Sequence, residues 1–212
     1  MDFNKQKQEL IEVLKDMGIT DSSVLSAIEK VPRERFVPKE FLEQSYDNYP
    51  LPIAGGQTIS QPYTVALMLQ ALELKKGDKV FEIGTGSGWN AALISKIVGK
   101  EGVVYTTEIV PELIQSAKKN LKEYKNVNLL ELDGSKGYEK ESPYDKIIVT
   151  VACPDIPKPL IQQLKENGIL VAPVGPQYSQ IMVKLTKIRG KIERESLGNF
   201  VFVPLKGEYG YK

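Results

Sequence analysis

The sequence KVFEIGTGSGWN, residues 79–90, combines a short apolar segment with three closely spaced glycines. Its first part, residues 79–84, has the length and apolar character of a buried strand, and the residues after the glycines have a helical pattern. Gly84, Gly86 and Gly88 lie at the turn between the two elements. Glycine lets a backbone bend sharply and approach a ligand closely, and three alternate glycines exceed what a plain strand–helix turn needs. The segment therefore predicts a ligand-binding loop at the carboxyl end of a strand.

The chain around this loop alternates between strand and helix patterns. The strand patterns cover residues 79–84, 102–109, 126–133, 144–152 and 169–175. The helical patterns between them cover residues 63–73, 89–98, 111–124 and 158–168, the last of which Gly168 is expected to end. Such alternation predicts an α/β fold with a doubly wound, mostly parallel, Rossmann-like sheet that is covered on both faces.

The segments on both sides of this core are expected to belong to the same domain. Residues 1–77 contain two further helical patterns and a loop, and residues 176–212 predict a pair of strands that turns at Arg189-Gly190. No linker, repeat or low-complexity tract separates these segments from the core at residues 78–175. We therefore expect one domain over the whole chain.

The composition excludes several classes of protein. The 212 residues carry 28 basic and 27 acidic side chains, so the net charge of +1 gives no sign of a nucleic-acid partner. No apolar run approaches the roughly 18 residues of a membrane-spanning helix, and the polar start MDFNKQKQEL is unlike a signal peptide. We expect a cytoplasmic protein without nucleic-acid or membrane partners. The sequence leaves the oligomeric state open, with a monomer slightly favoured.

The chain has no histidine and a single cysteine, Cys153. These counts exclude an intrachain disulfide, a Ser-His-Asp triad, a Cys-His pair and any histidine-ligated metal site. We expect no metal, and we interpret Cys153 as a small buried residue and not as a nucleophile. The chemistry must proceed without imidazole, which favours a nucleophile that needs no strong base or a cofactor that carries the activation.

The spacing of the glycines narrows the choice of ligand. They form G-x-G-x-G, whereas a dinucleotide site has G-x-G-x-x-G, and no Lys-Ser/Thr pair follows as in a P-loop. Glu108 ends the second strand, about 20 residues beyond Gly88, where a carboxylate can accept hydrogen bonds from both ribose hydroxyls. Asp133 and Gly134 end the third strand, from which a side chain could reach an adenine edge. The simpler alternatives are a solvated strand end for Glu108 and a turn for Asp133.

The glycine loop with an acidic residue at the end of the second strand resembles class I S-adenosylmethionine-dependent methyltransferases over roughly residues 78–175. A second resemblance covers nearly the whole chain. The segments GGQTISQPY, FEIGTGSG, YDKIIVTVA, ILVAPVG and FVPL occur together in this order, and RERFVP precedes them. In this combination they resemble protein-L-isoaspartate O-methyltransferases.

The second resemblance implies methyl transfer from S-adenosylmethionine to the carboxylate of L-isoaspartyl residues in damaged proteins and peptides. The cofactor product is S-adenosylhomocysteine, and the methyl ester closes to a succinimide that begins repair. The resemblance implies cofactor contacts from the following residues: Gln57, Thr58, Ile59, Ser60, Glu82, Gly84, Thr85, Gly86, Gly88, Glu108, Ile109, Asp133 and Gly134. Leu132 and Val151 depart from the glycine and alanine of many relatives, and Val151 could alter the substrate pocket.

The same resemblance places Ser60 at the active site and Gly55, Gly56 and Tyr63 at the substrate. The acceptor carboxylate is already an anion at neutral pH, so Ser60 is expected to position it and not to attack. The simpler alternatives are a flexible Gly55-Gly56 turn, a helix cap at Ser60 and a core position for Tyr63. Residues 203–206 are further candidates for peptide contacts.

Two other hypotheses stay open. Relatives of this family could methylate ordinary aspartates in a particular peptide. Alternatively, the chain could bind an adenosyl ligand and a protein partner without turnover. A nicotinamide dehydrogenase is disfavoured, because it needs a glycine spacing that the chain lacks.

Overall fold

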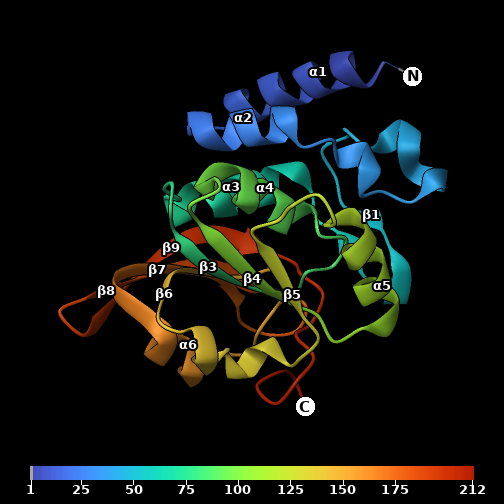
Figure 1. Cartoon of the computed structure of the whole chain (residues 1–212). Helices are drawn as coiled ribbons and strands as arrows, with labels where there is room; N and C mark the ends of the chain where they lie inside the picture. Colours follow the sequence, from blue (N-terminus) through green and yellow to red (C-terminus); the bar gives the residue numbers. More distant parts are fainter. Residues whose placement is uncertain (1) are drawn as a thin grey trace.

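The computed structural model describes residues 2–212 and contains a seven-stranded sheet (Figure 1). In sequence order its strands are β3 Lys79–Ile83, β4 Val103–Thr107, β5 Val127–Leu130, β6 Tyr144–Val149, β7 Leu164–Val174, β8 Gln180–Ile188 and β9 Lys191–Phe200. Their order across the sheet is β5-β4-β3-β6-β7-β8-β9. Strands β3 to β7 pair in parallel, whereas β8 and β9 form an antiparallel pair at one side. The doubly wound, mostly parallel α/β sheet and the C-terminal strand pair are thus confirmed.

Alternate residues of the central strands face two hydrophobic cores. Val80 and Ile148 contribute to the core beneath the N-terminal helices, whereas their neighbours Phe81 and Ile147 contribute to the core on the other face. All four side chains are buried. In a sheet that is covered on both faces, the residues that point to either face must be apolar. This explains why the strand patterns in the sequence are continuously apolar.

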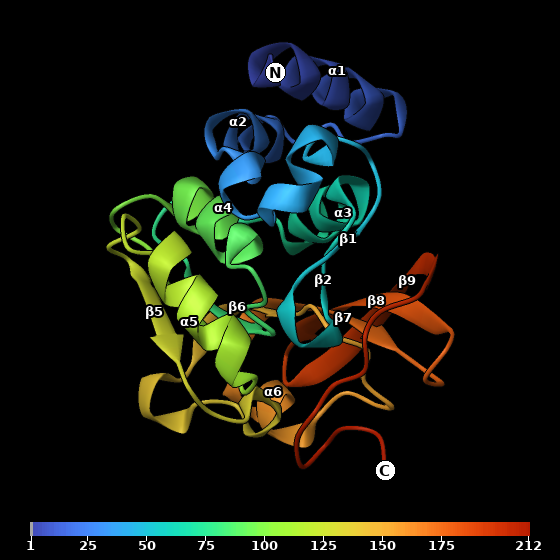
Figure 2. The same cartoon turned by 90° about the vertical axis from the view of Figure 1, so that its right-hand side faces the viewer.

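Helices cover the two faces of the sheet. They are α1 Phe3–Asp16, α2 Ser22–Lys30, α3 Pro62–Leu72, α4 Trp89–Val98, α5 Pro111–Asn120 and α6 Lys158–Gln163. Helices α1 and α2 lie above α3 and α4 on the side away from the sheet, and α6 lies on the opposite face (Figure 1, Figure 2). No helix within residues 2–212 is long and apolar enough to cross a membrane.

Helix α6 is shorter than the sequence pattern indicates. It ends at Gln163, and the expected end at Gly168 is wrong. Leu164 already pairs with Tyr144 of β6, and the pairing shifts before it resumes further along β7. Asn167 has a φ of 61° within this irregular stretch. Tertiary pairing with β6 therefore overrides a helical pattern that is amphipathic but short.

The last strand ends before the apolar pattern of the sequence does. Strand β9 stops at Phe200, although the apolar pattern continues to Leu205. The carbonyl of Val203 accepts from the amide of Ala152 at 2.8 Å, and the amide of Leu205 donates to the carbonyl of Ala152 at 2.7 Å. Residues 201–205 therefore leave the hairpin and run to the carboxyl end of β6.

Candidate functional site

A cavity of about 430 Å³ opens at the carboxyl ends of β3, β4 and β6. Strand β4 lies on one side of β3 and β6 on the other, so the chain order reverses beside β3. Open α/β sheets bind ligands at such switch points, and the volume lies within the range of small-molecule sites. The small antiparallel pair β1 Leu51–Pro52 and β2 Thr58–Ile59 and the C-terminal segment complete the wall.

The cavity gathers most of the sequence-predicted residues from distant parts of the chain. Those in its wall are Gln57, Thr58, Ile59, Ser60, Gly84, Thr85, Gly86, Glu108, Ile109 and Gly134. Leu132 and Val151, the two departures from the family pattern, also line it. The wall does not include Gly55, Gly56, Tyr63, Glu82, Gly88 or Asp133.

The glycine loop begins at Gly84, whose backbone has a φ of +94°. The hydroxyl of Thr150 donates to the carbonyl of Gly84 at 2.7 Å. A Cβ at Gly84 would lie 2.6 Å from that hydroxyl, so only glycine fits the position. The amides of Gly84 and Thr85 both donate to the carbonyl of Thr107, at 3.1 and 3.0 Å. The loop is thus held by β4 and β6, and its open side faces the cavity.

Glu108 follows β4 and lies next to this loop in the cavity wall. Its Oε2 accepts from the amide of Gly86 at 2.9 Å, and its Oε1 accepts from the amides of Ile109 and Val110 at 2.9 and 3.0 Å. A carboxylate offers about four acceptor positions, so Glu108 keeps capacity for a ligand hydroxyl. The buried carboxylate and the open glycine loop together fit the ribose and the adjoining part of an adenosyl ligand.

Glu82 supports the loop from behind the cavity wall. Its buried carboxylate accepts from the amide nitrogen of Asn90 at 2.7 Å and from the hydroxyl of Thr106 at 2.5 Å. Thr106 in turn shares a 2.6 Å hydrogen bond with the hydroxyl of Thr85. Burial raises the pKa of Glu82 to about 7. Asn90, and not Glu82, contributes to the wall, so the structure places Glu82 one layer behind the predicted contact.

Replacing Glu82 with glutamine should flatten the pH dependence of stability. Between the ordinary pKa of 4.5 and the raised pKa of about 7, the folded protein keeps a proton that the unfolded chain releases. The free energy of unfolding therefore falls as pH rises through this window, by up to about 3 kcal/mol from this group. Glutamine keeps the shape and does not ionise. Urea titrations at about pH 5 and about pH 8 should differ less for the variant than for the wild type. If the free energy of unfolding changed equally between the two pH values in the variant and in the wild type, the raised pKa of Glu82 would be contradicted.

Trp89 begins α4 directly after Gly88. It is buried in the core, and it also lines the cavity. The guanidinium of Arg33, from the RERFVP segment, lies 4.4 Å from the centre of its ring, and burial lowers the pKa of Arg33 to about 9. The Nε of Arg33 donates to the carbonyl of Ser45 at 2.8 Å. The RERFVP segment therefore packs behind the cavity through Trp89.

The GGQTISQPY segment presents Ser60 to the cavity. Ile59 is buried and pairs with Leu51, which anchors the strand next to Ser60. Helix α3 has no side-chain hydrogen bond at its N-cap, and the amide of Tyr63 donates to the side-chain oxygen of Asn48 at 3.0 Å. The alternative in which the hydroxyl of Ser60 caps this helix is therefore excluded. Ser60 itself lines the cavity.

Three of the predicted substrate residues, Gly55, Gly56 and Tyr63, lie outside the wall. Gly55 and Gly56 form an exposed turn beyond it, where a Cβ at Gly55 would lie 2.8 Å from the side chain of Val110. Tyr63 is half-buried and packs against the N-terminal core. A role for these residues in binding a substrate stays a prediction.

Asp133 turns away from the cavity, although its neighbour Gly134 lines it. Its carboxylate accepts from the amide and hydroxyl of Ser135, at 3.0 and 2.7 Å, and from the amide of Glu208 at 2.8 Å. These three bonds leave one acceptor position on the carboxylate, and a contact with adenine stays a prediction. Residues 203–206, which the sequence suggested as candidates for peptide contacts, line the wall. Nothing in the sequence indicated that Thr150 or residues 200–202 lie there.

Comparison with known proteins supports the class of protein that the fold and the cavity indicate. A doubly wound sheet with a G-x-G-x-G loop and an acid after the second strand is the arrangement of class I methyltransferases. The family model of protein-L-isoaspartate(D-aspartate) O-methyltransferase (PCMT) matches residues 5–210. The chain belongs to this family.

Curated relatives and solved structures extend this comparison. Protein-L-isoaspartate O-methyltransferase 2 of Archaeoglobus fulgidus is 48% identical over 100% of this chain and 98% of its own. The enzyme of that family from Dictyoglomus turgidum is 51% identical over 99% and 95%. A solved protein-L-isoaspartate O-methyltransferase superposes with a TM-score of 0.87 at 31% identity, covering 96% of this chain and 67% of its own. A Plasmodium falciparum structure assigned to PCMT, in complex with S-adenosyl-L-homocysteine, has a TM-score of 0.83 at 29% identity over 93% and 97%.

Proposed function

We propose that this chain transfers the methyl group of S-adenosylmethionine to the free carboxylate of L-isoaspartyl residues in damaged proteins and peptides. The observation that carries the proposal is the shared cavity, in which Ser60 of the GGQTISQPY segment lies in one wall with the glycine loop and Glu108. Membership of the family and the S-adenosyl-L-homocysteine complex of the Plasmodium relative support the choice of donor and acceptor.

The residues around the glycine loop would hold the cofactor. Glu108 would accept from the ribose hydroxyls, and the open face of Gly84 and Gly86 would lie against the ligand. Thr58, Ile59 and the other wall residues predicted from the sequence would complete the contact. S-adenosylmethionine supplies a methyl group that is already activated on a sulfonium.

Ser60 would bind the acceptor. In an isoaspartyl residue the chain continues through the side-chain carboxyl, which leaves the α-carboxyl free and anionic at neutral pH. The hydroxyl of Ser60 would donate to one carboxylate oxygen and so orient the other, and alignment of this kind can contribute roughly 7–11 kcal/mol in favourable cases. No general base is required, in agreement with a chain that has no histidine.

Cys153 takes no part in this chemistry. It is buried, its thiol donates to the carbonyl of Pro173 at 3.3 Å, and burial raises its pKa to about 12. At neutral pH it is therefore a thiol, which is a weak nucleophile.

The product would be a methyl ester, which closes to a succinimide because methanol leaves far more readily than hydroxide. Hydrolysis of the ring returns part of the material to ordinary aspartate. The enzyme would thus begin a repair that uncatalysed chemistry completes, and its partners would be isoaspartyl-containing proteins and peptides.

The three segments of the chain would work as one domain. Residues 1–77 contribute Ser60, residues 78–175 contribute the glycine loop, and residues 176–212 contribute the remaining wall. The shared cavity supports this organisation.

An isoaspartyl peptide and methyl-labelled S-adenosylmethionine test the proposal. We expect label in the peptide and its release as methanol in mild base, since a carboxyl methyl ester is base-labile. The matched control is the same peptide with its free α-carboxyl converted to the primary amide, which should take no label. Label that resists base, or equal labelling of the amide, would contradict carboxyl methylation.

A further inference from the structure

The chain ends in a segment that forms one wall of the cavity. Residues 201–209, here called the C-terminal segment, follow β9 and cross the carboxyl edge of the sheet (Figure 2). Residues 201–206 line the cavity, and the first five of them are apolar. The sixth is Lys206, which is the one basic side chain among the wall residues that the structure describes. A peptide along this wall would therefore meet an apolar surface that ends in a cation.

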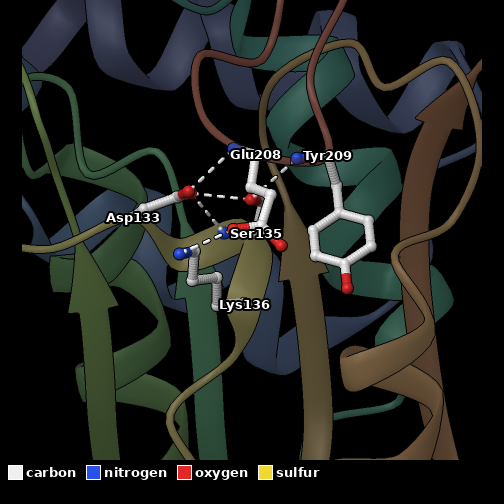
Figure 3. A network of polar contacts seen from close by, with 5 residues as sticks. All are labelled: Asp133, Ser135, Lys136, Glu208 and Tyr209. Atoms are coloured by element: carbon white, nitrogen blue, oxygen red, sulfur yellow. Dashed lines mark hydrogen bonds and ion pairs between the residues drawn. The ribbon is translucent and has the colours of Figure 1, made fainter.

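The backbone of the C-terminal segment is held on both sides of Lys206. The amide of Leu205 donates to the carbonyl of Ala152, which follows β6, at 2.7 Å. The amide of Glu208 donates to Oδ2 of Asp133, which follows β5, at 2.8 Å (Figure 3). Leu205 is buried, whereas Lys206 is exposed. The side chain of Lys206 therefore starts from a defined point on the rim of the cavity and extends toward solvent.

The acidic side chains close to Lys206 along this segment have other partners. The carboxylate of Glu208 pairs with Nζ of Lys136 at 2.7 Å, and Asp133 accepts from the amide of Glu208 (Figure 3). Within residues 2–212, no ion pair joins Lys206 to a carboxylate. The charge of Lys206 is therefore available to a ligand at the rim.

The one acidic residue among the described wall residues does not cancel this charge. Glu108 is buried, and its carboxylate already accepts from three backbone amides. Its remaining capacity is assigned to the ribose of the cofactor. Lys206 is exposed, so its attraction acts on groups that lie at the opening of the cavity.

We propose that Lys206 is a specificity-determining residue that favours isoaspartyl peptides with an aspartate or glutamate directly beside the isoaspartyl residue. This inference rests on the proposed function. Ser60 is assigned to the acceptor carboxylate, whereas Lys206 belongs to another element and lies at the exposed rim, where the neighbouring residues of the peptide pass. Its ammonium has three donors on a flexible stem, so it can reach an acid on either side of the acceptor.

Two pairs of isoaspartyl peptides test this preference. In the first pair the residue before the isoaspartyl residue is glutamate or glutamine, and in the second pair the residue after it is varied in the same way. We expect the wild type to have an about threefold higher kcat/KM for the glutamate peptide in at least one pair at low salt, because pairs of exposed charges are weak. The ratio should approach one at about 1 M salt, where the Debye length is about 3 Å.

Variants of Lys206 assign the preference to this side chain. Lys206→Gln should bring the ratio to about one, and Lys206→Glu should reverse it, so that the glutamine peptide is favoured about threefold. The two peptides are compared on the same variant, so a general loss of activity cancels in the ratio. Thermal unfolding of each variant establishes that it is folded.

The matched control is Lys100→Glu, which changes the net charge by the same amount as Lys206→Glu. Lys100 is exposed in the turn between α4 and β4, at the amino edge of the sheet and therefore at the opposite end of β4 from the cavity. Since a charge at that distance is screened, this variant should keep the ratio of the wild type.

Calorimetric titration of the same peptides in the presence of S-adenosylhomocysteine gives the ratio of their Kd values without turnover. A charge preference in binding without methylation would contradict the proposed function and would leave the role of Lys206 intact. A ratio near one for both pairs in the wild type would overturn that role. An equal loss for both peptides of a pair in Lys206→Gln would overturn it as well, because it would place the cation on the acceptor carboxylate.

Discussion

The Ser60→Ala variant should lose about 100-fold in kcat/KM for an isoaspartyl peptide, because misplacing an acceptor by about an ångström can cost that much. Its affinity for S-adenosylhomocysteine should stay within about twofold of the wild type, because the glycine loop and Glu108 remain in place. Initial rates with the labelled donor and calorimetric titration with the product give the two quantities.

The control for this variant is Ser116→Ala. Ser116 lies on α5, and its hydroxyl donates to the carbonyl of Glu112 at 3.2 Å, away from the cavity wall. Its kcat/KM for an isoaspartyl peptide and its affinity for S-adenosylhomocysteine should equal those of the wild type. Full methylation by Ser60→Ala with unchanged cofactor affinity would remove the positioning role of Ser60.

The Glu108→Ala variant should bind S-adenosylhomocysteine about 100-fold more weakly. It loses the acceptor for the ribose hydroxyls, and bonds to charged groups are each worth about 1.5–3 kcal/mol. It also frees the amide of Gly86, which the carboxylate now holds at 2.9 Å, so the glycine loop loses part of its preorganisation. Calorimetric titration measures the Kd directly.

Two further variants make this result specific. Glu108→Gln keeps the shape and one acceptor oxygen, so its loss should be smaller, about 10-fold. Glu112→Ala removes a carboxylate from the first turn of α5 and should bind as the wild type does. Unchanged affinity in Glu108→Ala would contradict the assignment of the ribose site.

Features that depend on nearby residues could be predicted from the sequence. The glycine loop follows from Gly84, Gly86 and Gly88, because a strand, a tight turn and a helix are encoded within a dozen residues. Glu108 follows from its place at the end of the next strand. The parallel sheet follows from alternating patterns that are apolar on both faces.

Features that depend on distant pairings could not be predicted in the same way. The carboxylate of Asp133 accepts from the amide of Glu208, 75 residues further along the chain, which its place at the end of a strand does not predict. The early end of α6 depends on Leu164 pairing with Tyr144. Thr150 supports Gly84 across the sheet. None of these contacts has a local sequence signature.

Glu82 illustrates a further limit. The family resemblance implies a cofactor contact for Glu82, whereas the alternation along β3 points its side chain into a buried network with Asn90 and Thr106. The layer in which a side chain lies depends on the twist and register of the sheet, which sequence spacing does not fix.

One competition assay tests the central claim most directly. Two peptides that differ only in whether one residue is linked as isoaspartate or as aspartate are mixed in equal amounts with methyl-labelled S-adenosylmethionine and the enzyme, and are then separated by chromatography. The account predicts base-labile label in the isoaspartyl peptide alone. Equal label in both isomers, label in the aspartyl peptide alone, or label in neither would contradict it.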